Sequence, residues 1–134
     1  MSTFLDLHER GNPLLCPNPW DVGSARILSS LGFKALATTS SGFAASLGRL
    51  DGSATREENL DSASAIATVV SIPITADLED GYASEAEGVA ETVRHAVTAG
   101  LAGCSVEDWD GTSFYPRDVA AARIGARCVC VFQT

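Results

Sequence analysis

Acidic side chains gather at two places in the sequence where short apolar runs end. Asp77 and Glu79 follow the run 72–76, and Glu107 follows the run 103–106. Alternation along a strand would point Asp77 and Glu79 the same way, and an adjacent strand would bring Glu107 to a similar height. Three carboxylates so close together repel one another and raise each other's pKa unless a cation shares the site. These residues are therefore candidate ligands for Mg²⁺, which prefers hard oxygen ligands; helix capping or exposure to solvent is the alternative.

A second candidate site is the stretch of small residues over 38–44, which reads Thr-Thr-Ser-Ser-Gly-Phe-Ala. Consecutive small residues at the end of a strand leave backbone N–H groups open, and these can hold a carboxylate, phosphate or enolate oxygen. An ordinary loop is the alternative interpretation. Neither a GxGxxG nor a GKS pattern occurs, so a dinucleotide site or a P-loop is not supported.

Short apolar runs alternate with helical patterns along the whole chain. The residues 40–52 are expected to form a Gly/Ser-rich loop, and Thr55-x-x-Glu58 and Ser84-x-x-Glu87 are capping-box signatures that predict helix starts. Strands are expected over 14–16, 35–39, 72–76, 103–106 and 128–132, and helices over 4–10, 23–31, 119–126 and after each capping box.

This alternation predicts an α/β fold with a parallel sheet and right-handed crossovers. Two architectures fit: a doubly wound open sheet, or part of an eight-unit barrel. In both, the loops after the strands form the working rim, and here those loops carry nearly all the polar side chains that could do chemistry. The opposite connections carry almost none.

Composition narrows the class of protein. The 134 residues have a net charge of −8 and are 46% hydrophobic, which suits one folded domain over 1–134. The acidic balance argues against nucleic-acid binding. Neither an apolar span of about 20 residues nor an apolar signal core is visible, so no membrane partner is expected and the predicted location is cytoplasmic.

Together, several segments resemble the isocitrate lyase / phosphoenolpyruvate mutase superfamily, up to about Arg123. The segments are Phe4-x-x-Leu7-His8, Pro17-Asn18-Pro19-Trp20-Asp21-x-Gly23-Ser24-Ala25-Arg26, Thr39-Ser40-Ser41-Gly42, Leu47-Gly48-x-x-Asp51, Ala76-Asp77-x-Glu79-x-Gly81-Tyr82 and Gly103-x-x-x-Glu107-Asp108. The resemblance implies a TIM-type (β/α)₈ barrel, of which this chain would be the amino-terminal half with about four βα units. It also implies a Mg²⁺-dependent lyase or mutase that acts on C–C or P–C bonds of small 2-oxo or 2-hydroxy carboxylates through an enolate-like intermediate.

The resemblance also implies roles for individual residues. Asp77 would bind Mg²⁺ directly, and Glu79 and Glu107 would hold metal-bound waters. Asp51 would be a catalytic residue on a loop near the reacting centre. The substrate's carboxylate and oxo group would be bound by Thr39, Ser40, Ser41 and Gly42.

Two departures from the family pattern bear on function. The lyases carry a Lys-Lys/Arg-Cys-Gly-His stretch after the acids of the fourth strand, whereas residues 109–115 here contain no cysteine. A mutase, hydrolase or decarboxylase-like relative therefore fits better. The tail 124–134 is atypical and the family's second half is missing, so open sheet edges are expected to drive self-association or homo-oligomer formation. A catalytically inactive fragment and a small Mg²⁺-binding flavodoxin-like domain remain alternatives.

Overall fold

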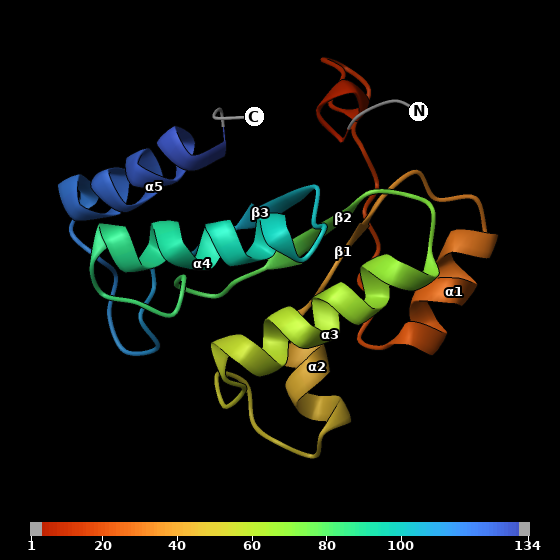
Figure 1. Cartoon of the computed structure of the whole chain (residues 1–134), viewed down its shortest axis with the longest axis horizontal. Helices are drawn as coiled ribbons and strands as arrows, with labels where there is room; N and C mark the ends of the chain where they lie inside the picture. The colour runs from red at the N-terminus through yellow and green to blue at the C-terminus, as the bar shows by residue number, and fades with distance from the viewer. Residues whose placement is uncertain (1–3, 132–134) are drawn as a thin grey trace.

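A parallel sheet lies at the centre of the molecule (Figure 1). The structure, a computed structural model, describes residues 4–131 and the side chains of residues 4–125. Within these residues the sheet has three strands in the order β1-β2-β3, namely β1 (Leu36–Ala37), β2 (Ile74–Asp77) and β3 (Gly103–Ser105). Leu36 pairs with Ile74, and Thr75 pairs with Gly103. The expected α/β class with a parallel sheet is confirmed.

Helices connect the strands and cover the sheet. They are η1 (Leu5–Leu7), α1 (Val22–Ser30), α2 (Ser40–Ser46), α3 (Arg56–Val69), α4 (Ala86–Thr98) and α5 (Arg117–Val131). The crossover from β1 to β2 contains α3, and the crossover from β2 to β3 contains α4. Figure 1 shows α3 and α4 in front of the strands, with α5 packed beside α4. None of the helices in the described part of the chain is long and apolar enough to cross a membrane.

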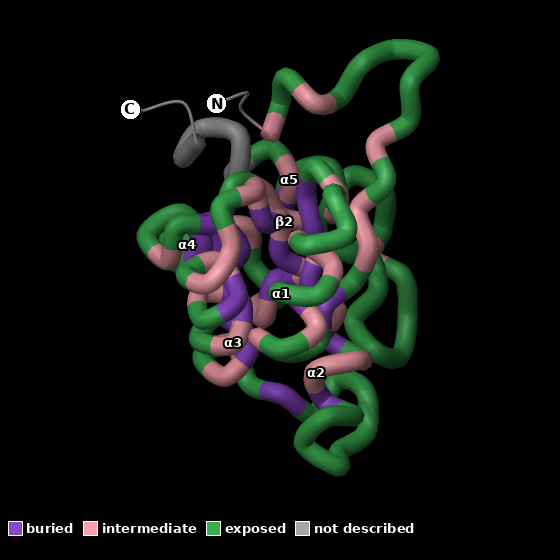
Figure 2. Tube along the Cα trace, turned by 90° about the vertical axis from the view of Figure 1, so that its right-hand side faces the viewer, coloured by how far each residue is buried: buried purple, intermediate pink, exposed green. Residues whose placement is uncertain are grey.

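The hydrophobic core lies between the sheet and the helices in front of it. Leu36 and Ile74 from the strands pack with Leu60, Ala63 and Ile66 from α3. The spacing of these three α3 residues places them on one face, which is the amphipathic pattern expected for a helix that covers a sheet. Figure 2 shows the buried residues gathered around β2, whereas α2 and the loop after it project from the body.

The capping box predicted at Thr55 forms at the start of α3. Thr55 is the N-cap, its Oγ1 accepts a hydrogen bond from the N–H of Glu58 (3.2 Å), and the Glu58 carboxylate accepts from the N–H of Thr55 (2.9 Å). Thr55→Ala is expected to lower the free energy of unfolding by about 1 kcal/mol, measured by urea denaturation. Ser84→Ala is the matched control: the second capping box does not form, because Glu85 is the N-cap of α4 and its side chain makes no capping hydrogen bond. An equal loss in both variants would contradict the structure.

Two expected strands are wrong. Residues 14–16 lie outside the sheet, because Pro13, Pro17 and Pro19 lack the N–H groups that a ladder needs. The segment is nevertheless tied to β1, since the N–H of Ala37 donates to the carbonyl of Pro17 (3.1 Å). The expected strand 128–132 is instead the end of α5 up to Val131, and residue 132 lies outside the described residues. A short apolar run does not distinguish a strand from a helix, and here the helix packed on α4 continues.

The expected loop 40–52 begins with a helix, α2, so this expectation is also wrong. Thr39 is the N-cap, and its Oγ1 accepts from the N–H of Gly42 (3.1 Å). This cap and the alanines that follow favour a helical turn over an open loop. At the chain start, the expected helix 4–10 is reduced to the single turn η1.

Candidate functional site

The carboxyl end of β2 carries Asp77, whose side chain is the anchor of the site. Its Oδ2 accepts hydrogen bonds from both the N–H (3.0 Å) and the Oγ–H (2.8 Å) of Ser40, at the start of α2. Its Oδ1 accepts from the N–H of Glu79 (3.2 Å). The backbone N–H of Asp77 donates to Thr38 Oγ1 (3.0 Å). Asp77 therefore joins the segments that follow β1 and β2.

The turn after β2 is held in an unusual backbone conformation. Glu79 has φ 47° and Tyr82 has φ 58°, both in the left-handed region that side chains other than glycine rarely adopt. Leu78 is fully buried, and its carbonyl accepts from the N–H of Gly81 (2.7 Å). Simple strand alternation therefore ends at Asp77, and the turn itself brings the Glu79 backbone against the Asp77 carboxylate. Such strained residues cluster at functional sites, where surrounding contacts hold them in place.

A cavity of about 350 Å³ lies where the loops after the three strands meet. Four predicted site residues line it together: Ser40, Asp51, Glu79 and Glu107. The remaining lining residues are Gly52, Asp80, Trp109, Asp110 and Gly111. The loops after β2 and β3 are in direct contact at this point, because the N–H of Glu107 donates to the carbonyl of Glu79 (2.6 Å). Asp77 reaches the cavity wall through its two hydrogen bonds to Ser40.

The other predicted substrate-binding residues do not line this cavity. Thr39 caps α2 and takes up the N–H of Gly42, so that N–H group already has an acceptor. Ser41 is exposed to solvent on the first turn of α2. Of the stretch 38–44, Ser40 donates to the Asp77 carboxylate and lines the cavity, and Thr38 accepts from the Asp77 backbone.

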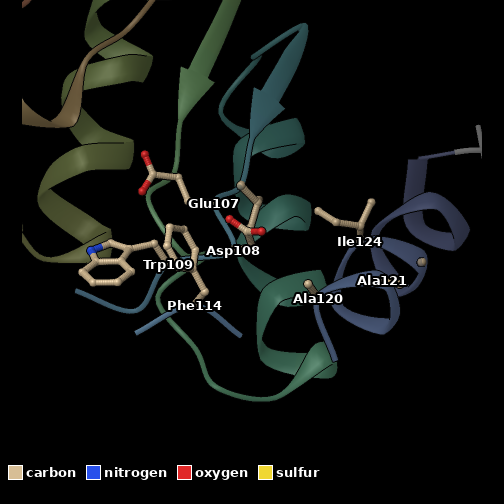
Figure 3. Close-up of a pocket in the computed structure, with 9 residues that line it drawn as sticks. Glu107, Asp108, Trp109, Phe114, Ala120, Ala121 and Ile124 are labelled. Atoms are coloured by element: carbon tan, nitrogen blue, oxygen red, sulfur yellow. The ribbon is translucent and has the colours of Figure 1, made fainter. Parts of the chain in front are cut away.

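A larger cavity, of about 840 Å³, lies between the loop after β3 and α5 (Figure 3). Ala120 and Ile124 of α5 face the loop that bears Asp108 and Phe114. Its lining is largely apolar, and Glu107 is the only predicted site residue among those that line it. The smaller cavity is therefore the stronger candidate, since chemistry requires convergent polar groups and not volume alone.

The electrostatics of the smaller cavity are dominated by carboxylates. Burial raises the pKa of Glu79 above its ordinary value, and the neighbouring Asp77, Asp51 and Asp80 raise it further, against a lowering by the Tyr82 hydroxyl. Burial also raises the pKa of Glu107, with the same acids adding to the shift. A bound cation would relieve this repulsion.

The raised pKa of Glu79 predicts a pH dependence of stability. The folded state holds the Glu79 proton more tightly than the unfolded state, so the free energy of unfolding falls as pH rises from 4.5 through the raised pKa. Glu79→Gln is neutral at every pH, so in chelator its stability advantage over the unmodified protein is expected to grow as pH rises from 4.5 through the raised pKa of Glu79. Urea denaturation across this range measures it, with exposed Glu91→Gln as control. Parallel curves for Glu79→Gln and the unmodified protein would contradict the prediction.

Two further residues, Asn59 and Tyr82, support the acids, although the sequence suggested a role for neither. Asn59 of α3 is buried, and its Nδ2 donates to the carbonyl of Asp77 (3.1 Å) and to the Tyr82 hydroxyl (2.6 Å). The Tyr82 hydroxyl in turn donates to Glu79 Oε1 (3.3 Å). The available signal was an asparagine beside the apolar stripe of α3, which by itself suggests no role. Trp109 and Asp110 could have been found, because they directly follow Glu107 and Asp108 in the sequence.

The donor set fits a hard divalent cation. All the candidate ligand atoms of Asp77, Glu79 and Glu107 are carboxylate oxygens, the type that Mg²⁺ prefers. Among the side chains of residues 4–125, no three Asp, Glu, His or Cys groups form a preformed metal cage. Mg²⁺ usually keeps several waters and binds one or two carboxylates directly, so the residues suit this ion better than one that needs a full protein cage.

Comparison with known proteins places this geometry in context. The family described as phosphoenolpyruvate phosphomutase matches residues 4–128. An uncharacterized protein of Mycobacterium tuberculosis is 39% identical over 125 residues, which cover 92% of this chain and 47% of that protein. The 2-methylisocitrate lyase of Escherichia coli is 34% identical over 102 residues, covering 75% of this chain and 34% of the enzyme.

A solved crystal structure is also similar to this chain. The crystal structure of a Burkholderia cenocepacia protein, named only by the class lyase/mutase, superposes with a TM-score of 0.94 at 41% identity. The match covers 98% of this chain and 49% of that one. The chain thus spans about half the length of these Mycobacterium and Burkholderia proteins.

Proposed function

The chain belongs to the phosphoenolpyruvate mutase / isocitrate lyase superfamily, whose members are lyases and mutases, and we propose that its acidic cavity is the active site of such an enzyme. The enzyme would be Mg²⁺-dependent and would act on C–C or P–C bonds of small 2-oxo or 2-hydroxy carboxylates through an enolate-like intermediate. One observation carries the proposal: Ser40, Asp51, Glu79 and Glu107 converge on one cavity at the carboxyl ends of adjacent parallel strands. Active sites of parallel α/β proteins lie at this end of the sheet.

The proposed architecture is a (β/α)₈ barrel of which this chain forms about four units. Neighbouring strands follow chain order, β1-β2-β3, as barrel strands do. A flavodoxin-like sheet would instead reverse its strand order near its start. The segment around Pro17 fits the place of a first unit beside β1, because its carbonyl accepts from Ala37 and the Asn18 side chain donates to the Ala37 carbonyl (2.9 Å).

In this proposal Asp77, Glu79 and Glu107 hold the Mg²⁺ ion. The ion, when bound, would offset negative charge that develops on substrate oxygens. Ser40 ties Asp77 to the start of α2, so the proposed metal-binding and substrate-binding segments are held together by two hydrogen bonds. Trp109 forms a wall of the cavity, and its ring would exclude water from that side.

The segment at the start of α2 would bind the substrate. The substrate's carboxylate would be bound by Ser40 once one of its two hydrogen bonds to Asp77 is exchanged for the substrate, with Thr39, Ser41 and Gly42 shaping the turn that presents it. Asp51 lines the same cavity and would accept or donate a proton at the substrate. Because residues 109–115 contain no cysteine, the proton chemistry of the proposed reaction does not use a thiol in this loop, which favours a mutase, hydrolase or decarboxylase over a lyase.

The test is a turnover screen with defined substrates. The purified chain is incubated with phosphonopyruvate and a panel of small 2-oxo and 2-hydroxy dicarboxylates, and products are followed by proton and phosphorus NMR. Turnover that requires Mg²⁺ and stops on addition of chelator supports the proposal. Mg²⁺ binding by calorimetry without turnover would instead support the non-catalytic alternative, a domain that has kept the site but not the reaction.

The proposed partners are a small carboxylate and a second copy of the chain. β3 is an outer strand of the described sheet, and Phe114, in the loop that follows it, is a large apolar side chain exposed to solvent. Unpaired strand edges favour association with another chain. Sedimentation velocity is expected to show a species larger than the monomer, and a single compact monomer at all concentrations would contradict this part.

A further inference from the structure

Arg123 of α5 is a buried charge with no part in the proposed reaction. Its side chain is 2% exposed. Its Nη1 donates to the carbonyl of Ser84 (3.3 Å), and its Nη2 donates to the carbonyl of Asp80. The guanidinium also lies over the ring of Tyr115, 3.6 Å from the ring centroid. A guanidinium is taken out of water only at considerable cost, so this set of contacts defines one position for the side chain.

Asp80 is the acid that this arginine engages. Its Oδ2 lies 3.8 Å from Arg123 Nη2 and accepts a hydrogen bond from the Tyr115 hydroxyl (2.9 Å). Its Oδ1 accepts from the backbone N–H of Tyr82 (2.9 Å). Both oxygens of Asp80 therefore have partners within the protein, one of them on the loop after β3.

The contacts of Arg123 reach both of the loops that bear the acids. Asp80 and Ser84 belong to the loop after β2, which carries Glu79, and Tyr115 belongs to the loop after β3, which carries Glu107. The two loops touch at one end through the backbone of Glu79 and Glu107, as described above. Arg123 closes the other end, so each loop is fixed against the other at two points.

We propose that Arg123 is a positioning residue that, through Asp80 and Tyr115, holds the loops after β2 and β3 together so that Glu79 and Glu107 face one cavity. The Mg²⁺ part of this inference rests on the proposed function. The loop-holding part does not, because it follows from the contacts alone.

A lysine at position 123 is not expected to hold the two loops together as the arginine does. The planar guanidinium donates to two carbonyls and stacks on an aromatic ring at the same time, whereas a lysine ammonium presents a point charge on a flexible stem. Arg123→Lys is therefore expected to behave like Arg123→Met, although it keeps the charge. Arg117, an exposed arginine in the first turn of the same helix, provides the matched control Arg117→Met.

The experiment measures two quantities on the whole chain. Hydrogen exchange at the amides of Gly81 and Tyr82 reports on the loop, with the amides of Ala63 and Ile66 in α3 as internal reference. Calorimetric titration with MgCl₂ alone reports on the site. In Arg123→Lys and Arg123→Met, exchange at the loop amides is expected to be about tenfold faster and Mg²⁺ affinity about tenfold weaker, the size of effect typical for residues that orient ligands. The α3 amides and Arg117→Met are expected to be unchanged.

The possible results test the loop-holding role of Arg123 separately from Mg²⁺ binding. Unchanged loop exchange in a folded Arg123 variant overturns the inference, as does equal acceleration in Arg117→Met. If the unmodified chain binds no Mg²⁺, the proposed function fails while loop exchange still decides the role of Arg123. Ile66→Val, a core variant of lowered stability, must leave Mg²⁺ affinity unchanged, or a general loss of stability explains the effect. If the Arg123 variants do not fold, Tyr115→Phe decides: faster exchange at Gly81 and Tyr82 supports the inference and unchanged exchange overturns it.

Discussion

Replacing Asp77 with alanine is expected to weaken Mg²⁺ binding by about 100-fold or more, since the loss of outer-shell partners alone typically costs about 10- to 100-fold. Asp77 is the proposed direct ligand. It also organises the site, because its two oxygens accept hydrogen bonds from Ser40 and Glu79. The substitution therefore removes a ligand charge and frees the loop that carries a second acid. Calorimetric titration with MgCl₂ measures the change directly.

A second variant separates these two effects. Asp77→Asn keeps an oxygen that can accept from Ser40 but removes the negative charge. It is expected to preserve the fold by circular dichroism and still to lose most of the Mg²⁺ affinity, since a neutral amide is a poorer ligand for a hard cation. Asp61→Asn, an exposed acid on α3, serves as the control for a simple change in net charge. Mg²⁺ affinity in Asp77→Asn equal to that of the unmodified chain would refute the assignment of Asp77 as ligand.

The largest effect on stability is expected from Leu78→Ala. Leu78 is 0% exposed and belongs to the core cluster that β2 forms with α3 and α4. Truncating a fully buried leucine costs the transfer free energy of the lost methyl groups and leaves a cavity, typically about 2–5 kcal/mol in all. The backbone of Leu78 is held as well, because its N–H donates to the carbonyl of Ser105 (3.2 Å). The site cannot therefore collapse easily around the smaller side chain.

Urea denaturation followed by circular dichroism measures the free energy of unfolding of this variant. Leu50→Ala is the matched control, because Leu50 is 84% exposed and its truncation should change stability by no more than about 0.5 kcal/mol. A loss below about 1 kcal/mol in Leu78→Ala would show that this position does not anchor the turn. Leu78 lies directly between Asp77 and Glu79, so the same core contact that stabilises the fold also places the two acids.

This link between core and site explains how the acids can be held together at all. Their burial and, to a lesser extent, their mutual repulsion raise the pKa of Glu79 and Glu107, and both oppose folding of the charged site in the absence of a cation. The left-handed φ of Glu79 adds strain at the same place. Burial of Leu78 and the contacts of Asn59 and Arg123 offset both costs. Because the acids repel one another, a bound cation would relieve this repulsion and stabilise the folded chain.

The sequence by itself determined the features that depend on local chemistry. The alternation of apolar runs and helical patterns predicted the parallel α/β class, because burial on a sheet and along a helix face requires those periods. The acids at the ends of β2 and β3 could be placed at one rim, because parallel strands end at the same edge. The capping box at Thr55 formed as expected, because its hydrogen bonds join residues only three apart.

Other features were decided only by tertiary structure, because they depend on contacts between distant residues. Ser84 begins an equal capping signature, but α4 starts one residue later and the carbonyl of Ser84 is engaged by Arg123. Asn59 acquired a role only when α3 packed on β2 and brought it to Asp77, 18 residues away. The partners of Arg123 lie 39 and 43 residues away, and no periodicity or motif relates them. Local patterns specify which elements form and at which edge the acids lie, whereas the burial of a polar side chain, and hence its partner, follows only from the packing of the whole chain.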